Sequence, residues 1–367
     1  MKLEKRLKPL CYLENGNLLA YCFGNLYVVD LNLFQVTKKC AVNLGYKEKY
    51  FSRIKLLYRF LRLGIRSTIQ INQEIIVLLA NKRFYELNLQ NMKLKAGFIP
   101  KSGINTLNIS VLKGISGFDD MVVFGGYFSN PKKNPVHIYK RIDLDTWEIV
   151  FSFPMGKINH IHNIVPDADN SCVWIFTGDF DESAAIWQAR DNFGDVECIV
   201  SFDQIYRGCV AFPLNKGVLY ATDSPFAQNS IRFLYNDGNG WVSVHVANIN
   251  GSCIYGCMIK NKYVFSTVVE PDGRDEDLLK LIFGWKRGNG IKDSFAYIYI
   301  GDMDDGFKEI YKAKKDKFSF IFQFGALKFP SGVNNTDYIL TEHIATKKYD
   351  CSTVAILVGQ EDNKKND

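Results

Sequence analysis

Apolar strands and polar turns alternate along this chain, and the pattern returns about every 45 residues. Two copies show it most clearly: the apolar stretch Val173–Thr177 is followed by Gly178 and Asp179, and Val218–Thr222 is followed directly by Asp223. In both copies a strand runs into a carboxylate and then a turn. Repeats of this length, built from short strands, are typical of a β-propeller in which each copy forms one blade.

The repeat can be followed through its second strand, which is the most apolar one and occurs seven times. These strands are expected at Asn17–Cys22, Glu74–Ala80, Met121–Gly125, Val173–Thr177, Val218–Thr222, Tyr263–Val268 and Asp337–Glu342. Third strands, each pairing with the second strand of its own blade, are expected at Asn25–Val29, Arg83–Leu87, His137–Arg141, Ala184–Ala189, Ser230–Leu234, Ala296–Ile300 and Ser352–Val358. Turns rich in Gly, Asn and Asp separate them, as in β-hairpins. The sequence predicts an all-β fold, one β-propeller domain over residues 1–367. Seven four-stranded blades fit best, with six or eight left open.

Three segments depart from the repeat. Residues 47–66 precede the second blade and predict one inserted helix, because an apolar stripe at helical spacing lies beside a basic one. Residues 270–292 form a polar insertion in the sixth blade, and residues 359–367 form a polar tail. The last blade has no obvious outer strand after Val358, so residues near Lys2–Leu7 are expected to supply it and close the ring.

Composition indicates a soluble, cytoplasmic protein. No apolar run approaches the ~20 residues that a membrane-spanning helix needs, and the basic N-terminus lacks the apolar core of a secretion signal. The 9 cysteines are scattered without a C-x-x-C pair, which is typical of reduced core residues. The formal net charge of +6 equals that of segment 47–66 alone, which holds seven basic residues and one acidic residue. The remaining chain is neutral overall, so no nucleic-acid partner is expected.

Polar side chains recur at positions that should share one face of the disc. The first strand of a blade leaves one face near the central channel, and the second strand returns to it. Starts of first strands would place His160, His162, Tyr206 and Arg207 there, and ends of second strands would add Tyr127, Asp179, Asp223, Glu270 and His343. Because side chains alternate along a strand, the first two histidines should point the same way.

Each of these groups has a catalytic and a structural interpretation. The two histidines could act as a general base near pH 7 or could bond neighbouring loops. Their spacing indicates no third ligand, so no metal and no cofactor is expected. Arg207 either forms a structural ion pair with Asp179 or Asp223, or binds the carboxylate of a substrate. The carboxylates, Glu270 included, either cap turns or form the acid pair of glycoside hydrolysis.

Two short stretches resemble degenerate Asp-boxes, the turn motif of sialidase-like BNR-repeat propellers. They are Ala189–Asp195 and Gly301–Ile310, and both lack the Ser and Trp of that motif. The block from Ile158 to Pro225 resembles sialidase-like propellers encoded among bacterial surface-polysaccharide genes. Sialidases hold the substrate carboxylate with three arginines, and here Arg207 and Arg66 are the candidates.

The layout also resembles propeller polysaccharide lyases, which remove a proton beside a uronic-acid carboxylate. That resemblance implies His160 or His162 as the base and Arg207 as the carboxylate-binding residue, with Tyr206 or Tyr127 as the proton donor. Hydrolysis would instead use Asp179 and Asp223 as acid and nucleophile. Residues expected to contact the sugar are Tyr127, Glu270 and His343.

Two functions therefore stay open. The first is a carbohydrate-active propeller of a bacterial surface-polysaccharide pathway, which binds an acidic oligo- or polysaccharide with or without cleaving it. The second is a non-catalytic scaffold that organises glycan-assembly proteins at the inner membrane. In that case the helix Lys47–Arg66 would contact an anionic membrane surface or a glycosyltransferase. Otherwise this helix packs on the rim of the propeller with a solvated basic face.

Overall fold

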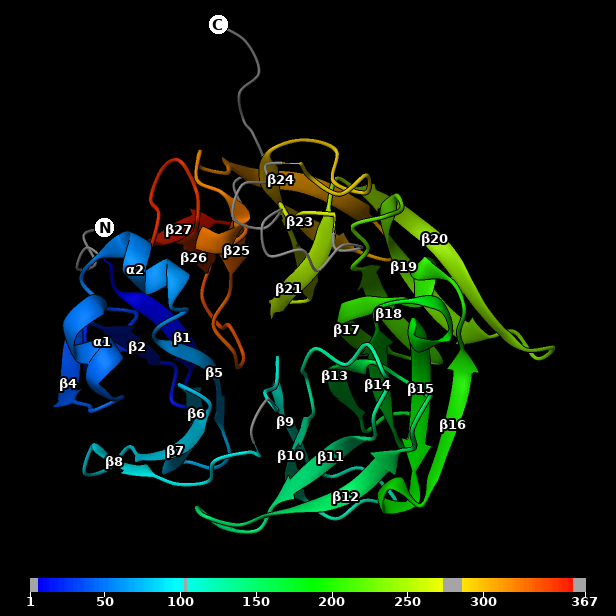
Figure 1. Ribbon diagram of the computed structural model, residues 1–367, viewed down its shortest axis with the longest axis horizontal. Coiled ribbons are helices and arrows are strands. Elements are labelled where there is room, and N and C mark those ends of the chain that lie inside the picture. Colours follow the sequence, from blue (N-terminus) through cyan, green and yellow to red (C-terminus); the bar gives the residue numbers. More distant parts are fainter. Residues whose placement is uncertain (1–5, 102–103, 273–285, 359–367) are drawn as a thin grey trace, which may run out of the picture.

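Seven antiparallel sheets follow one another around a ring in the computed structural model, which describes residues 6–101, 104–272 and 286–358 (Figure 1). Six of the sheets have four strands, and the seventh has three within the described ranges. This arrangement is the predicted seven-bladed β-propeller.

Each blade is built from consecutive strands. The first two blades are β1 (Lys8–Tyr12), β2 (Leu18–Cys22), β3 (Asn25–Asp30) and β4 (Gln35–Ala41), then β5 (Ile65–Gln70), β6 (Ile75–Ala80), β7 (Arg83–Asn88) and β8 (Lys93–Ala96). The third and fourth are β9 (Ile109–Leu112), β10 (Met121–Gly125), β11 (Val136–Arg141) and β12 (Trp147–Phe153), then β13 (His160–Asp167), β14 (Cys172–Gly178), β15 (Ala185–Arg190) and β16 (Asp195–Val200). The fifth and sixth are β17 (Gly208–Leu214), β18 (Gly217–Thr222), β19 (Asn229–Asn236) and β20 (Trp241–Ile249), then β21 (Ser252–Ile259), β22 (Lys262–Val268), β23 (Phe295–Asp302) and β24 (Gly306–Lys314). The seventh is β25 (Ala326–Lys328), β26 (Tyr338–Ile344) and β27 (Thr353–Leu357).

The second strands carry the strongest sequence signal because they are covered on both faces. All seven residues of β14 are buried, and so are all five of β2 and of β10. The outermost strand β4 is exposed at every residue except the half-buried Cys40. A strand covered by neighbouring blades on both sides needs an unbroken apolar run, whereas an edge strand does not. The predicted second and third strands accordingly match the observed ones to within about two residues.

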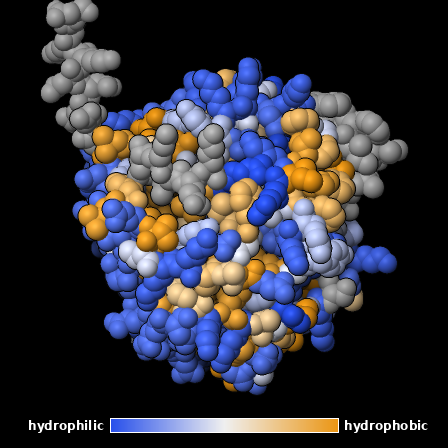
Figure 2. Space-filling view, turned by 90° about the vertical axis from the view of Figure 1, so that its left-hand side faces the viewer, coloured by the Kyte–Doolittle hydropathy of each residue, from blue (hydrophilic) through white to orange (hydrophobic). Residues whose placement is uncertain are grey.

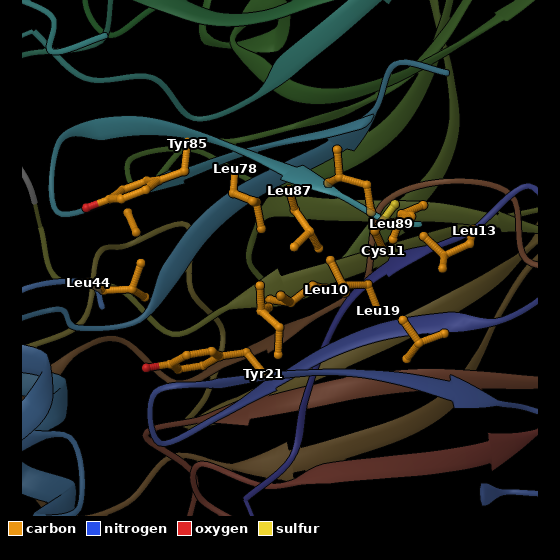
Figure 3. Packing of buried hydrophobic residues seen from close by; sticks show 14 residues of the cluster. Leu10, Cys11, Leu13, Leu19, Tyr21, Leu44, Leu78, Tyr85, Leu87 and Leu89 are labelled. Atoms are coloured by element: carbon orange, nitrogen blue, oxygen red, sulfur yellow. The ribbon is translucent and has the colours of Figure 1, made fainter. Parts of the chain in front are cut away.

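The hydrophobic cores lie between adjacent blades. Figure 3 shows one of them, where Leu10 and Leu19 of the first blade meet Leu78 and Leu87 of the second. Leu19 and Leu87 are both 0% exposed. Full burial of one such side chain stabilises the folded state by about 1.5–3 kcal/mol, so each blade depends on its neighbours for stability.

The ring closes where the seventh blade meets the first. Leu340 of β26 packs in one cluster with residues of β2 and β3, and the Tyr12 amide donates to the Ser331 carbonyl at 2.8 Å. The Thr353 hydroxyl donates to the Leu7 carbonyl at the start of the chain. Residues 2–5 of the expected closing strand lie outside the described residues, so that strand stays a prediction.

The inserted segment is helical, but it forms two short helices where one was expected. They are α1 (Tyr46–Phe51) and α2 (Lys55–Phe60), and Ile54 between them has an extended backbone. Each helix buries one charged residue: Glu48 accepts bonds from Tyr21 and from the Gly64 amide, and Arg59 is 2% exposed. Tyr50 and Ile54 of the expected apolar stripe are exposed, and its other residues are only half-buried, so the stripe does not form one buried face. No described helix is long and apolar enough to cross a bilayer.

The two stretches that resemble Asp-boxes both lie between third and fourth strands of their blades. The first contains the 3-10 turn Asp191–Phe193 between β15 and β16, and the second turns between β23 and β24. In the second, Asp302 Oδ1 accepts from the amides of Asp304 and Asp305. Of the other predicted segments, residues 273–285 of the insertion and the tail 359–367 lie outside the described residues.

Candidate functional site

Polar residues of the third to sixth blades converge on one face of the propeller, beside the central channel. His160 opens β13, Asp179 follows β14, and Arg207 precedes β17. These residues are within hydrogen-bonding or ion-pairing distance of one another. The rule that starts of first strands and ends of second strands share a face therefore holds here.

Three potential ligand atoms lie close together in this group. The Nε2 atoms of His160 and His162 are 3.0 Å apart, and Asp179 Oδ1 lies 3.3 Å from the first and 3.1 Å from the second. The Nδ1 atoms face backbone carbonyls instead: that of His160 is 3.2 Å from the Phe128 oxygen, and that of His162 is 3.2 Å from the Gly208 oxygen. A carbonyl oxygen can only accept, so each Nδ1 carries a proton. The neutral form of each ring then has an unprotonated Nε2.

Gly178 allows the His162 ring to occupy this position. A Cβ on residue 178 would overlap the imidazole ring, so a side chain there would displace the histidine. Glycine is used here for close approach, since its lack of a Cβ lets a neighbouring group lie against the backbone. Nothing in the sequence pattern distinguished this glycine from one in an ordinary turn.

Arg207 is occupied by carboxylates. Its Nη2 lies 3.0 Å from Asp179 Oδ1, and its Nε lies 3.7 Å from Asp223 Oδ2. Burial alone would raise the pKa of Asp179, but the guanidinium and His160 outweigh burial and hold that pKa well below its usual range. Of the two interpretations of Arg207, the ion pair describes its position in this structure.

Two further carboxyl groups sit deeper in the same cluster. Asp223 is 3% exposed, and the Cys209 thiol lies 3.1 Å from its Oδ2. Burial raises the pKa of Asp223, although Arg207 opposes the shift. Burial and repulsion by Asp223 raise the pKa of Glu270 to about 8. Glu270 Oε1, Asp223 Oδ1 and Arg207 Nε are all buried without a hydrogen-bond partner, so the polar network is incomplete as it stands.

Tyr127 links this cluster to the opposite side of the channel mouth. Its ring centroid lies 4.3 Å from that of His160, and the Arg66 guanidinium carbon of the second blade lies 6.0 Å from the same ring centroid. Burial and the nearby Asp179 raise the pKa of the Tyr127 phenol. The phenol therefore stays protonated at neutral pH.

A cavity of about 610 Å³ lies in the central channel. Tyr127 and the histidine–carboxylate cluster are not among its lining residues, although their neighbours Asn163 and Cys209 are. First strands of all seven blades line it, and its cationic wall comes from the first, second and seventh blades. The cations there are Lys8, Arg59, Arg62, Arg66 and Lys328.

Positive charge exceeds negative charge on that wall. Glu342, the one carboxylate among the described lining residues, is already paired with Lys8. Within the described part of the chain, no ion pair satisfies Arg62, Arg66 or Lys328. Burial lowers the pKa of Lys328 to about 8, and Arg66 and Lys8 repel its charge as well. The wall is therefore suited to an anionic ligand.

Two predicted site residues lie apart from the histidine cluster. Tyr206 packs against the core cluster of Trp174 and Tyr220. His343 lies against Tyr311, with ring centroids 5.7 Å apart, and burial lowers its pKa to about 4. Among the described residues, neither side chain forms a hydrogen bond or ion pair with the histidine cluster.

Sequence reasoning missed most of the cationic wall. Arg62 and Arg66 were assigned to a solvated basic stripe and Arg66 was weighed only through the sialidase resemblance, whereas Lys328 was not considered at all. The rule that selected first-strand starts applies equally to Arg66, the second residue of β5. It does not select Lys328, which is the last residue of the three-residue strand β25.

No family model matches the chain, and no curated protein matches its sequence. Among solved structures, an oligogalacturonate lyase in complex with manganese is similar with a TM-score of 0.54 and 12% identity, covering 95% of this chain and 88% of that one. A chain of the mitotic checkpoint complex is similar with a TM-score of 0.53 and 8% identity, covering 98% and 92%. The AfRom2 CNH domain is similar with a TM-score of 0.52 and 9% identity, covering 97% of this chain and 95% of that one.

Dihydro-heme d1 dehydrogenase NirN gives a TM-score of 0.49, and the match spans 62% of its length. At these identities the similarity shows the fold alone: the chain is a seven-bladed β-propeller.

Proposed function

We propose that this propeller binds an acidic glycan of a bacterial surface-polysaccharide pathway at the channel mouth and cleaves it by elimination. The observation that carries the proposal is a cationic wall that Tyr127 connects to the histidine–carboxylate cluster. Arg66 and Lys328, which have no ion-pair partner among the described residues, line the cavity. Tyr127 lies near both Arg66 and His160.

Arg66 takes the role that sequence reasoning gave to Arg207. A uronic-acid carboxylate needs a donor without a carboxylate partner of its own, and Arg207 is held by Asp179 and Asp223. Arg66 lines the cavity and faces Tyr127. A bidentate contact to a planar carboxylate suits its guanidinium better than a lysine ammonium.

Elimination suits the remaining groups better than hydrolysis does. A base removes the proton beside the carboxylate, a carbon–carbon double bond forms, and the glycosidic oxygen leaves with a proton from an acid. Tyr127 is the acid in this scheme, since its phenol stays protonated. Lys328 is the base, since its pKa of about 8 leaves a neutral fraction near pH 7. Asp223, at 3% exposed, is out of reach of a sugar.

The first test measures binding. Oligogalacturonate, a chain of uronic acids, is titrated into wild type and into Arg66→Met by calorimetry. Loss of a charged hydrogen bond should weaken binding by at least about tenfold. Arg53→Met, an exposed site on the same basic segment, is the matched control and should bind as wild type. Equal affinity for a neutral oligosaccharide, or unchanged binding by Arg66→Met, would contradict the proposal. An ultraviolet assay for unsaturated uronates tests cleavage separately.

A second function is favoured by the outer surface of α1 and α2. Tyr46, Tyr50, Ile54 and Phe60 are 67%, 64%, 52% and 45% exposed. The surrounding exposed charges, Lys47, Lys49, Arg53 and Lys55, are all basic. Glu48, the acidic residue of this segment, is buried. Figure 2 shows apolar residues exposed among hydrophilic ones on the side of the molecule that carries α1.

We also propose that this surface binds an anionic membrane, because apolar side chains ringed by lysine and arginine suit a negatively charged lipid surface. Wild type should float with vesicles that contain phosphatidylglycerol but not with pure phosphatidylcholine vesicles. The double variant Lys49→Glu with Arg53→Glu should remain at the bottom of the gradient, while Lys132→Glu on another blade should float. Equal flotation of all three proteins would rule the membrane function out.

A further inference from the structure

The cluster of His160, His162 and Asp179 has the arrangement of a metal site. From this geometry we infer that the two Nε2 atoms and Asp179 Oδ1 bind one divalent transition-metal ion, of the class that includes Zn²⁺, Mn²⁺, Fe²⁺ and Co²⁺. Two imidazoles and one carboxylate form a ligand set that such ions use in proteins.

Hydrogen bonding between neutral side chains does not account for the contact. Both Nδ1 atoms are committed to backbone carbonyls, at 3.2 Å each. The two Nε2 atoms therefore direct lone pairs toward each other at 3.0 Å and toward a carboxylate oxygen. Three acceptors in contact repel one another unless a cation lies among them, either a metal ion or the proton of an imidazolium. Backbone bonds at the distal nitrogen also fix the ring orientation, as they do for many metal-bound histidines.

The spacing of the three atoms fits a bound ion. An ion about 2.1 Å from each ligand places neighbouring ligands roughly 3.0 Å apart in octahedral geometry and about 3.4 Å apart in tetrahedral geometry. The observed separations are 3.0, 3.1 and 3.3 Å. The three atoms therefore need little rearrangement to bind metal.

The charge of the surroundings also favours a cation. Asp179, Asp223 and Glu270 face a single cation, Arg207, among the described residues of this cluster. Carboxyl groups therefore outnumber the cations of this cluster by three to one. Buried oxygens of Asp223 and Glu270 without partners are a further sign of an incomplete polar network.

A second triad, His162, Cys209 and Asp223, is a weaker candidate. Its three ligand atoms also lie close together, but Asp223 Oδ2 already contacts the Cys209 thiol at 3.1 Å. Asp179, with 23% of its side chain exposed, also gives the first triad an entry path that the second lacks.

Metal uptake is measured without any sugar, so this inference stands apart from the glycan proposal. The purified protein is stripped with a chelator, dialysed against Co²⁺ and assayed for cobalt per chain and for the visible d–d absorption. We expect one Co²⁺ per chain and a higher melting temperature with Co²⁺ than with chelator. His160→Gln and His162→Gln should each weaken uptake by at least about 100-fold.

His245→Gln, an exposed histidine on β20, is the matched control and should bind as wild type. The melting-temperature difference is read on wild type, so the test remains decisive if a variant misfolds. Less than about one ion per ten chains in wild type would overturn the inference, as would undiminished uptake by both variants. A thiolate-to-cobalt charge-transfer band, abolished in Cys209→Ala, would move the site to the second triad and overturn this assignment.

Discussion

Lys328 shows how a single residue is set by its neighbours in the folded ring. Its Nζ donates to the Arg66 carbonyl at 2.5 Å, and burial beside other cations lowers its pKa to about 8. A charged lysine kept under these conditions destabilises the folded state. Proteins retain such groups more often at functional sites than elsewhere, which agrees with the base role proposed for it.

The lowered pKa of Lys328 has a consequence for stability. Below pH 8 the lysine is charged in both the folded and the unfolded protein. The folded protein then bears the full free-energy cost of burying that charge. Between pH 8 and 10.5 the folded state binds fewer protons than the unfolded state, so stability rises with pH. Lys328→Met should therefore stabilise the protein at pH 7 by up to about 3 kcal/mol, and the gain should vanish by pH 10.5.

Urea unfolding across this pH range measures the effect. Lys132→Met, an exposed lysine, should change the free energy of unfolding by no more than about 0.5 kcal/mol at any pH. If the Lys328→Met variant is no more stable than wild type at pH 7, the Lys328 ammonium carries no net burial cost in the folded protein, and the prediction is wrong.

At the scale of elements, charged anchors hold α1 and α2 to the propeller. Arg59 donates to Asp316 and to the Phe322 carbonyl, and it also contacts Asp350 at 3.2 Å. These partners lie more than 250 residues away in the chain. The helix α2 is thus fixed to a distant blade, which places Arg62 and Arg66 at the cavity.

Loss of this anchor should be costly. Arg59→Met would leave two partly buried carboxylates without their cation, and removing one partner of a buried ion pair destabilises by about 3–5 kcal/mol. Because Asp316 and Asp350 keep some exposure, we expect a value near the lower limit. Denaturant unfolding measures it, with Arg53→Met as the control from the same segment. A loss below about 1 kcal/mol would mean that apolar packing, not the ion pairs, holds the helix.

At the scale of the whole molecule, closure of the ring creates the cavity. The cationic wall comes from the first, second and seventh blades, and the histidine cluster comes from the fourth and fifth. Leu340 and Ser331 connect the last blade to the first. Since strands of all seven blades line the cavity, no part of the chain forms it alone.

The sequence by itself indicated seven blades as the best count, the second and third strands, and the face on which His160, Asp179 and Arg207 meet. These follow from local patterns, because a strand covered on both faces must be apolar and alternate strands must run in opposite directions. The tertiary structure alone decided that Arg207 is paired and that Arg66 and Lys328 have no ion-pair partner among the described residues. It also placed Tyr206 and His343 apart from the histidine cluster and divided the inserted helix in two. Those outcomes depend on contacts between blades far apart in the chain, which no local pattern encodes.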